Sequence, residues 1–300
     1  DNASVNPPLV SPNYMQNGLI GAGAGLVLVY LAIFLRRSVD QRIRTRDDAI
    51  KATNSNILGV LPVSDDLAEE NIVRASNDDH IAHESIRQLR TNLRFVNIDN
   101  PPSSFIVTSA VPGEGKSTVS LAVARSMASS GQPVILIDAD LRRPSVSAAL
   151  GLPPGSPGLV QLMTRRASLD QCIKSVGGSS LKVLPAGRAA GNALDLLMSS
   201  RFGRLLDEMQ KHFDMVIIDC PPVQLVSDTL VLGRAASSMV FVARSDSTPL
   251  QVIRRALHRI DKAGISVLGV VLNAHDFAQA DRFYGESSGY GSGGYNYAYG

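Results

Sequence analysis

The sequence predicts an α/β fold in which a doubly wound, mostly parallel sheet is preceded by one transmembrane helix and followed by a disordered, tyrosine-rich tail. Apolar runs of strand length alternate with helical patterns across residues 80–276, as they do in parallel sheets that helices cover on both faces. Residues 18–35 contain no charged side chain, and residues 285–300 are rich in Gly, Ser and Tyr. These observations divide the chain into an apolar helix, a folded domain and a tail that cannot bury a core.

The composition excludes several classes of protein. A hydrophobic content of 44% and a charged content of 19% fit a globular α/β domain with an additional apolar segment. A net charge of +2, without a basic stripe interleaved with aromatic residues, gives no indication of nucleic-acid binding. Cys172 and Cys220 are too far apart for a CxxC metal site and are predicted to be free thiols. Because the chain begins with Asp1, we expect it to be a fragment of a longer protein.

The N-terminal region predicts a helix that spans a membrane at residues 18–36. At about 1.5 Å per residue, its uncharged stretch reaches roughly 27 Å, which is just enough for a hydrocarbon core. The alternative is a buried helix of a soluble protein. Five arginines lie in residues 36–46, whereas Asp1 is the one charged residue before the stretch. The positive-inside rule therefore places the chain after this helix in the cytoplasm.

Residues 37–79 are charged and mixed, which predicts a juxtamembrane linker that leads through the apolar stretch at residues 57–62 into an edge element. The segment that follows is predicted to be a helix, because apolar residues recur on one face. On this helix Glu84, Arg87 and Arg90 are spaced three apart and form one oblique stripe. By itself, such a stripe is explained by a solvated face with one intrahelical ion pair.

A glycine-rich loop follows the apolar strand at residues 105–108 and precedes an alanine-rich helix. Strand, glycine loop, Lys-Ser/Thr and helix is the order that a phosphate-binding P-loop requires. Ala110 stands where the pattern has its first glycine, and a small residue still fits there. The sequence therefore predicts a nucleotide site with ATP or ADP and Mg²⁺ as cofactors. The predicted binding residues are Gly113, Glu114, Gly115, Lys116, Ser117 and Thr118.

Two further apolar strands end in carboxylates at the edge of the sheet where the P-loop opens. Asp138 and Asp140 follow one strand, and Asp219 follows the other. Lys116 is expected to reach the β- and γ-phosphates, while Ser117 and Asp219 are expected to hold Mg²⁺ directly or through water. Three carboxylates beside one P-loop indicate a catalytic site rather than a solvated surface.

Residues 277–300 are predicted to form a flexible tether, because the apolar periodicity ends there. A solubilising, low-complexity tail is the ordinary explanation of such a segment. Five of the seven tyrosines of the chain lie in it, which suggests that their hydroxyl groups are used. These predicted phosphoacceptors are Tyr284, Tyr290, Tyr295, Tyr297 and Tyr299.

Taken together, these features resemble the cytoplasmic half of a bacterial tyrosine autokinase, or BY-kinase, of the capsule and exopolysaccharide export systems. Residues 110–118 are similar to the Walker A motif of that family, and residues 135–144 to its distinctive second Walker motif. Residues 216–222 are similar to its Walker B motif. The E-x-x-R-x-x-R motif with which the family assembles rings matches the stripe described above.

The resemblance implies a P-loop NTPase sheet of the MinD/ParA type and a catalytic set formed by Lys116, Asp138, Asp140 and Asp219. It implies that Asp138 receives or orients the incoming phenol and that Asp140 supports the metal or the substrate. Ser117, Asp138 and Asp219 are the metal ligands that it implies. The reaction would be the transfer of phosphate from ATP to protein tyrosine.

The resemblance also implies that the tail tyrosines are phosphorylated between subunits of a ring, in which Glu84 of one subunit meets Arg87 and Arg90 of the next. Residues 18–36 would anchor the chain in the bacterial inner membrane, with residues 1–17 as a periplasmic stub and the kinase domain in the cytoplasm. The partners that the family suggests are a cognate tyrosine phosphatase and proteins of polysaccharide polymerisation and export.

Two other interpretations stay open. Dimerising ATPases of the MinD/ParA group share the sheet, but they carry an extra lysine in the P-loop where this chain has Val111. A structural regulator of polysaccharide chain length would have a degenerate nucleotide pocket, against which the intact Lys116 argues. Residues 187–199 match a further stretch of the kinase family imperfectly, because Ala193 replaces its proline and Asp195 its glutamate.

Overall fold

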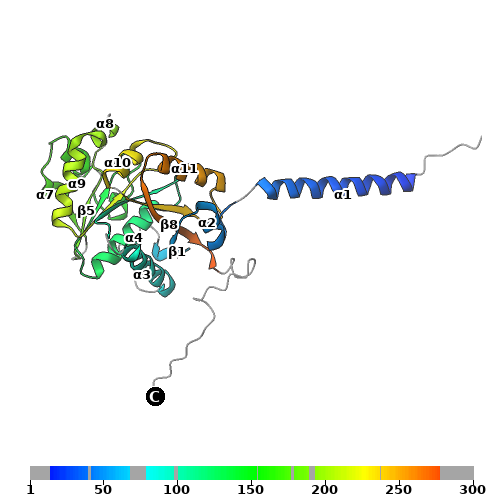
Figure 1. Ribbon diagram of the computed structural model, residues 1–300, viewed down its shortest axis with the longest axis horizontal. Coiled ribbons are helices and arrows are strands. Elements are labelled where there is room, and N and C mark those ends of the chain that lie inside the picture. The colour runs from blue at the N-terminus through cyan, green and yellow to red at the C-terminus, as the bar shows by residue number, and fades with distance from the viewer. Residues whose placement is uncertain are drawn as a thin grey trace, which may run out of the picture. The chain divides into compact units, whose positions relative to one another are not determined.

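The structure of the chain is a computed structural model in two units, Asp1–Gln41 and Arg42–Gly300, which are described separately here (Figure 1). The placed residues are 14–39, 42–67, 79–97, 101–153, 155–176, 179–188, 193–236 and 238–277. The five predicted phosphoacceptor tyrosines of the tail lie outside these described residues, and so do residues 189–192 of the imperfect family stretch.

The first unit contains one helix, α1 (Tyr14–Val39), of 26 residues. Its segment Tyr14–Phe34 is long and apolar enough to cross a membrane, judged by length and composition. The helix is longer at both ends than the predicted span of residues 18–36. The prediction followed the apolar composition, whereas the backbone hydrogen bonds of a helix do not depend on the side chains and continue into the flanking polar residues.

The second unit is built on one eight-stranded sheet with the order β1-β8-β7-β2-β6-β3-β5-β4. Every pair of neighbours is parallel except β4 and β5. The strands are β1 Ile57–Pro62, β2 Ser104–Ser109, β3 Val134–Asp138, β4 Lys174–Ser175, β5 Leu181–Leu184, β6 Met215–Asp219, β7 Ser238–Arg244 and β8 Ser266–His275. The predicted α/β class with a mostly parallel sheet is confirmed.

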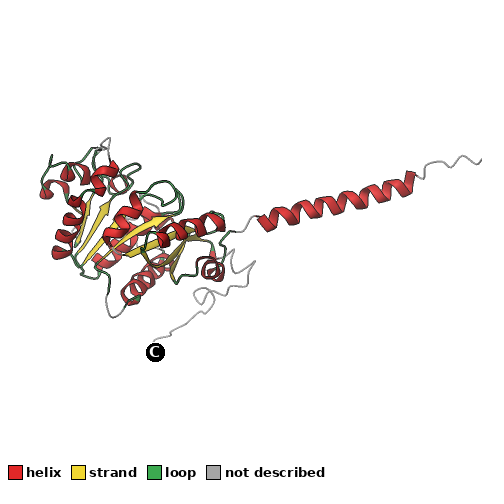
Figure 2. Ribbon diagram, turned by 45° about the horizontal axis from the view of Figure 1, so that its top comes forward, coloured by secondary structure: helices red, strands yellow, loops and turns green. Residues whose placement is uncertain are grey.

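Helices cover both faces of this sheet (Figure 2). In chain order they are α2 Arg46–Thr53, α3 His80–Phe95, α4 Lys116–Ser129, α5 Val146–Ala149, α6 Leu159–Met163, α7 Leu169–Cys172, α8 Ala193–Met198, α9 Ser200–His212, α10 Asp228–Ala236 and α11 Leu250–Lys262, with a 3₁₀ turn at Asp65–Leu67. Side chains alternate between the two faces of a strand, so every strand except the two-residue β4 contributes to two separate cores.

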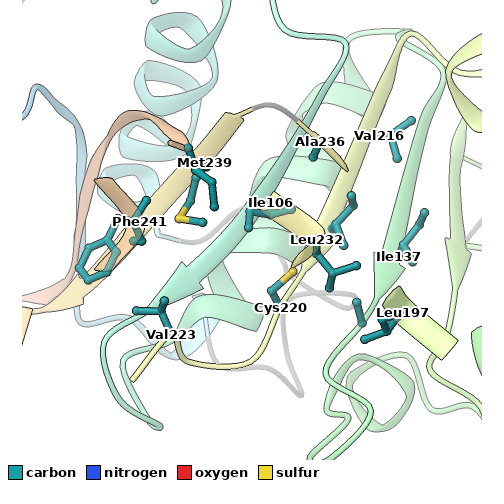
Figure 3. Packing of buried hydrophobic residues seen from close by; sticks show 14 of the residues in the cluster. Ile106, Ile137, Leu197, Val216, Cys220, Val223, Leu232, Ala236, Met239 and Phe241 are labelled. Carbon is teal, nitrogen blue, oxygen red and sulfur yellow. The ribbon is translucent and has the colours of Figure 1, made fainter. Parts of the chain in front are cut away.

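Along β2, Ile106 joins one core, while Phe105 and Val107 join the other. The core that contains Ile106 packs the sheet against α2, α9, α10 and α11, and Figure 3 shows Leu232 and Phe241 within it. The second core packs the opposite face against α3 and α4. The strands are apolar on both faces for this reason, which explains the near-continuous apolar runs of the sequence.

The compact unit begins earlier than the predicted domain start at residue 80. Residues 42–62 of the predicted linker form α2 and the edge strand β1, which pairs in parallel with β8. Thr45 caps α2 through a capping box with Asp48. The apolar stretch at residues 57–62 predicts an edge element, and β1 is the edge strand of the sheet. The helix α2 has eight residues, which are too few for a periodic pattern.

We expect truncation of Leu61 in β1 to destabilise the whole second unit. Leu61 is fully buried in the core shared with α3 and α4. Leu61→Ala should therefore lower the free energy of unfolding by about 2–5 kcal/mol, as for other buried leucines. Denaturant unfolding measures this change. Val63→Ala is the matched control, because Val63 is exposed just after β1 and should alter stability by less than about 0.5 kcal/mol. Equal, small effects of both substitutions would contradict the assignment of β1 to the folded core of the second unit.

Candidate functional site

The P-loop connects β2 to α4 and depends on two glycines with positive φ. Gly113 has φ 82° and Gly115 has φ 87°, in the region that only glycine enters freely. Gly115 is also the N-cap residue of α4. A Cβ atom at Gly115 would collide with the side-chain amide of Asn273. Glycine is therefore required at this position for its backbone conformation and for the close approach of β8.

Glu114 lies between these glycines, but its side chain points into the protein. It is 1% exposed. Its Oε2 accepts a hydrogen bond from the backbone N–H of Val111 (2.8 Å), and its Oε1 accepts one from the Thr248 hydroxyl (2.7 Å). Burial raises the pKa of this carboxyl above its usual value, and the two donors oppose that shift. Among the predicted binding residues, Glu114 thus holds the shape of the loop, and its backbone alone remains available to a ligand.

Lys116, the first residue of α4, is surrounded by carboxylates. Its Nζ lies 3.0 Å from Asp140 Oδ2 and 3.5 Å from Asp219 Oδ2, and it donates a hydrogen bond to Ser117 Oγ at 3.0 Å. Burial works against the ammonium charge, but the carboxylates of Asp219 and Asp140 outweigh it and raise the pKa of Lys116 above its ordinary value. The contacting carboxylates therefore favour the charged form of the lysine.

The structure brings the three predicted carboxylates together at the ends of β3 and β6. Asp138 and Asp219 are both fully buried and stand opposite each other in the parallel register. Ser117 and Ser120 donate hydrogen bonds to the two oxygens of Asp219, at 2.5 and 3.2 Å. Burial and the neighbouring Asp219 charge raise the pKa of Asp138 well above its usual value.

The cluster fits a divalent cation bound together with a nucleotide. Asp138 Oδ2 is buried and has no hydrogen-bond partner within the described part of the chain. Ser117 and Asp219 stand side by side at the start of α4, where a P-loop serine and a Walker B acid hold Mg²⁺. No group of three His, Cys, Asp or Glu side chains among the described residues is arranged to bind a metal alone. The remaining ligands would therefore be hydroxyl, phosphate and water oxygens.

A cavity of about 910 Å³ opens above the P-loop, Asp140 and the ends of β6 and β8. Of the three carboxylates, Asp140 lines this cavity, whereas Asp138 and Asp219 lie behind it. The described charged residues of the lining are Lys116, Asp140, Arg142, Arg143 and Arg244. Four positively charged side chains and one carboxylate give the lining an excess of positive charge, which suits a polyphosphate ligand.

Sequence reasoning missed several residues of this site. Asn273 lies at the end of β8 and donates a hydrogen bond to Glu114 O (3.0 Å). Arg244 ends β7 and donates one to Gly113 O (3.2 Å). Both residues follow apolar runs of the sequence. Because ligands of parallel sheets bind at the carboxyl ends of the strands, this position was a signal that could have identified them. Arg142 lies 3.3 Å from the buried Asp228, and no local pattern connects these two residues.

The structure divides the predicted stripe on α3. Glu84 and Arg87 are exposed and form an ion pair at 3.4 Å. Arg90 is half-buried and donates a hydrogen bond to Ser126 O of α4 at 2.8 Å. The stripe therefore presents Glu84 and Arg87 to solvent, while Arg90 also ties α3 to the P-loop helix.

Comparison with known proteins places the chain in a family. A family model for an AAA domain matches residues 106–266, more than half of the chain. Tyrosine-protein kinase YwqD of Bacillus subtilis is 32% identical over 215 residues, which cover 72% of this chain and 90% of YwqD. The chain belongs to the bacterial tyrosine kinases. The resemblance predicted from the Walker motifs is thereby confirmed.

Structural comparison agrees with this membership. The kinase domain of the Escherichia coli tyrosine kinase ETK superposes with a TM-score of 0.71 and 27% identity, over 83% of this chain and 99% of that chain. EpsB of Ralstonia nicotianae is 31% identical over 289 residues, which cover 92% of this chain. The chain spans 38% of the length of EpsB. The similarity to this bacterial tyrosine kinase family thus includes the P-loop, the strand-end acids and the segment before them.

We expect Gly115→Ala to abolish most of the affinity for Mg-ADP, because the new Cβ would displace Asn273 as well as strain the loop. Gly131→Ala is the matched control. Gly131 has the same φ of 87°, but a Cβ there would meet no atom within 4 Å. This control should lose about 1–2 kcal/mol of stability and keep its nucleotide affinity. Calorimetric titration with Mg-ADP measures both variants, and equal affinities would contradict the role given to the close contact.

Proposed function

We propose that the chain is an ATP-dependent protein-tyrosine kinase that phosphorylates its own C-terminal tyrosines between subunits of a ring. The observation that carries this proposal is the convergence of Lys116 with Asp138, Asp140 and Asp219 beside one P-loop. The cationic cavity fits the phosphates of ATP, and a relative that the chain covers over most of its length is named a tyrosine-protein kinase.

In this proposal the phosphates lie along the backbone N–H groups of the P-loop and the start of α4. Lys116 exchanges its contact with Asp140 for the β- and γ-phosphate oxygens. Ser117 and Asp219 hold Mg²⁺, which when bound neutralises charge on the phosphates. Phosphoryl transfer has a loose transition state, so positioning and charge neutralisation by these residues supply most of the rate enhancement.

Asp138 is proposed to be the base for the acceptor. The tyrosine oxygen attacks the γ-phosphorus, the bond from that phosphorus to the ADP oxygen breaks, and the phenol proton passes to Asp138 Oδ2. A phenol has a pKa of about 10 and is a poor nucleophile at neutral pH. Burial raises the pKa of Asp138, which makes its carboxylate a stronger base than an exposed aspartate.

The proposal extends to the surroundings of the domain. α1 would anchor the chain in the bacterial inner membrane, with the kinase domain, which includes the segment from residue 42 onward, in the cytoplasm. Regulation of polysaccharide polymerisation and export, with a tyrosine phosphatase as a partner, is the role that the family suggests. The alternative is a membrane-bound ATPase switch of the MinD/ParA type. That class carries a lysine in its P-loop at the position where this chain has Val111.

Intact mass after incubation with Mg-ATP tests the proposed activity. We expect mass increases in steps of one phosphate that map to Tyr284 through Tyr299 and that are absent in Lys116→Met. ATP hydrolysis without any gain in mass would instead support the switch.

Asp138→Asn refines the same experiment. It should abolish phosphorylation and preserve Mg-ADP binding, because it removes the base and keeps the shape of the side chain. Asp140→Asn is the comparison, since Asp140 is the carboxylate that lines the cavity. A larger loss of phosphorylation with Asp140→Asn would transfer the role of base to Asp140.

The ring is proposed to depend on Glu84 and Arg87, which α3 presents to solvent. Each phosphotyrosine carries about −1.5 to −2 charges, so phosphorylated tails should repel one another and favour dispersal. We expect Arg87→Ala to lower the oligomer mass measured by light scattering, whereas Arg255→Ala on α11, also exposed, should leave it unchanged. Equal masses of the phosphorylated and unphosphorylated protein would contradict the proposed cycle.

A further inference from the structure

The turn between β7 and α11, residues 244–249, contacts the P-loop at two consecutive residues. The Thr248 hydroxyl donates a hydrogen bond to Glu114 Oε1 at 2.7 Å, and Arg244 Nη1 donates one to Gly113 O at 3.2 Å. The backbone N–H of Ser245 in the same turn donates to Asn273 O at 2.9 Å. The turn is thus tied both to the P-loop and to the strand that packs against it.

The contact between Thr248 and Glu114 lies in the interior. Thr248 is 3% exposed, and both oxygens of Glu114 already have their donors within the described structure. A buried carboxylate oxygen that loses its donor is costly, because no water replaces the lost hydrogen bond. The position of Thr248 therefore constrains Glu114, and through Val111 and the flanking glycines it constrains the backbone that faces the cavity.

The other side of the same turn is held by the segment at residues 42–44. Ile43 is buried, and its carbonyl accepts a hydrogen bond from the backbone N–H of Asp246 at 2.8 Å. Arg42 Nη1 donates to Asp246 O at 3.1 Å, and Arg44 Nε donates to Asp246 Oδ1 at 2.8 Å. Arg42 and Pro249 also form an antiparallel bridge.

Asp246 has φ 47°, a left-handed conformation that a non-glycine residue keeps only where its surroundings fix it. Three hydrogen bonds from residues 42–44 supply that fixation. The turn is therefore held by residues 42–44 at Asp246, and two residues further along the chain it contacts Glu114 through Thr248. Residues 42–44 are separated from the end of α1 by two residues of the sequence.

We propose that Thr248 is a positioning residue of the P-loop that acts through Glu114, and that residues 42–44 set its position through Asp246. The inference rests on the proposed nucleotide site, because nucleotide affinity is what the contacts control. A force or a ligand that displaces residues 42–44 would release Thr248 from Glu114 and weaken nucleotide binding at the P-loop.

The test uses the full chain in detergent micelles and compares Thr248→Val with Thr248→Ser. Valine keeps the shape of threonine without the hydroxyl, and serine keeps the hydroxyl. Thr248→Val should bind Mg-ADP about tenfold more weakly in calorimetric titration, which is the effect of one lost buried hydrogen bond. Thr248→Ser should stay within about twofold of the wild type. Unchanged affinity of Thr248→Val, or equal weakness of both variants, would overturn the proposal.

Steady-state kinetics separate positioning from a general loss of structure. Thr248→Val should raise the KM for ATP while kcat stays within about twofold, because the chemical groups are untouched. A merely structural role would lower the active fraction, and hence the apparent kcat, at constant KM. If Thr248→Val fails to fold, Thr248→Ala, which also lacks the hydroxyl, takes its place in both measurements: weaker Mg-ADP binding supports the proposal, and wild-type affinity overturns it.

Asp246→Asn tests the anchor at residues 42–44. Asparagine accepts the left-handed conformation but loses the charge that meets Arg44, so we expect Mg-ADP affinity to fall about threefold to fivefold. Glu208→Gln is the matched control, because it removes an exposed ion pair on α9 and should leave affinity unchanged. Wild-type affinity of Asp246→Asn would overturn the anchoring role. A chain that binds Mg-ADP but phosphorylates no tyrosine would defeat the proposed kinase activity and leave this inference standing.

Discussion

The charge of Lys116 is the constraint on which the site depends. The Lys116 side chain lies at the wall of the cavity and is 12% exposed, and an ammonium group so largely removed from water is stabilised by carboxylates in contact. Asp140 and Asp219 supply them at 3.0 and 3.5 Å. Asp138 adds a third acid beside the one lysine, and burial together with the neighbouring Asp219 charge raises the pKa of Asp138. Three carboxylates around one ammonium group leave an excess of negative charge, which suits a further cation.

The order of the strands brings these groups together. β2 lies between β7 and β6, and β3 follows β6, so the P-loop emerges in the middle of the sheet with the acids of β6 and β3 on one side. The ends of β7 and β8 lie on the other side and deliver Arg244 and Asn273. The site is therefore a consequence of parallel pairing, since carboxyl ends meet at one edge only when the strands run in one direction.

This dependence explains which parts could be predicted from the sequence. The P-loop and the acids after β3 and β6 have local signals, namely glycines beside Lys-Ser and apolar runs that end in Asp. The membership of α2 in the domain had no such signal, because the helix is too short for periodicity. Thr248 and Glu114 are 134 positions apart, and no local pattern connects the turn before α11 with the P-loop.

Glu114 shows that one residue of a motif can serve two purposes. Its place in the P-loop pattern predicts contact with the cofactor, for which its backbone N–H remains available, while its carboxylate is turned inward and accepts hydrogen bonds from Val111 and Thr248. A P-loop must present its backbone N–H groups in one fixed arrangement, and its glycines by themselves favour no single conformation. The order that glycine cannot provide comes from Glu114, which links the flexible loop to a turn held at Asp246. The conformation of the loop is thus held by contacts that lie outside its own sequence pattern.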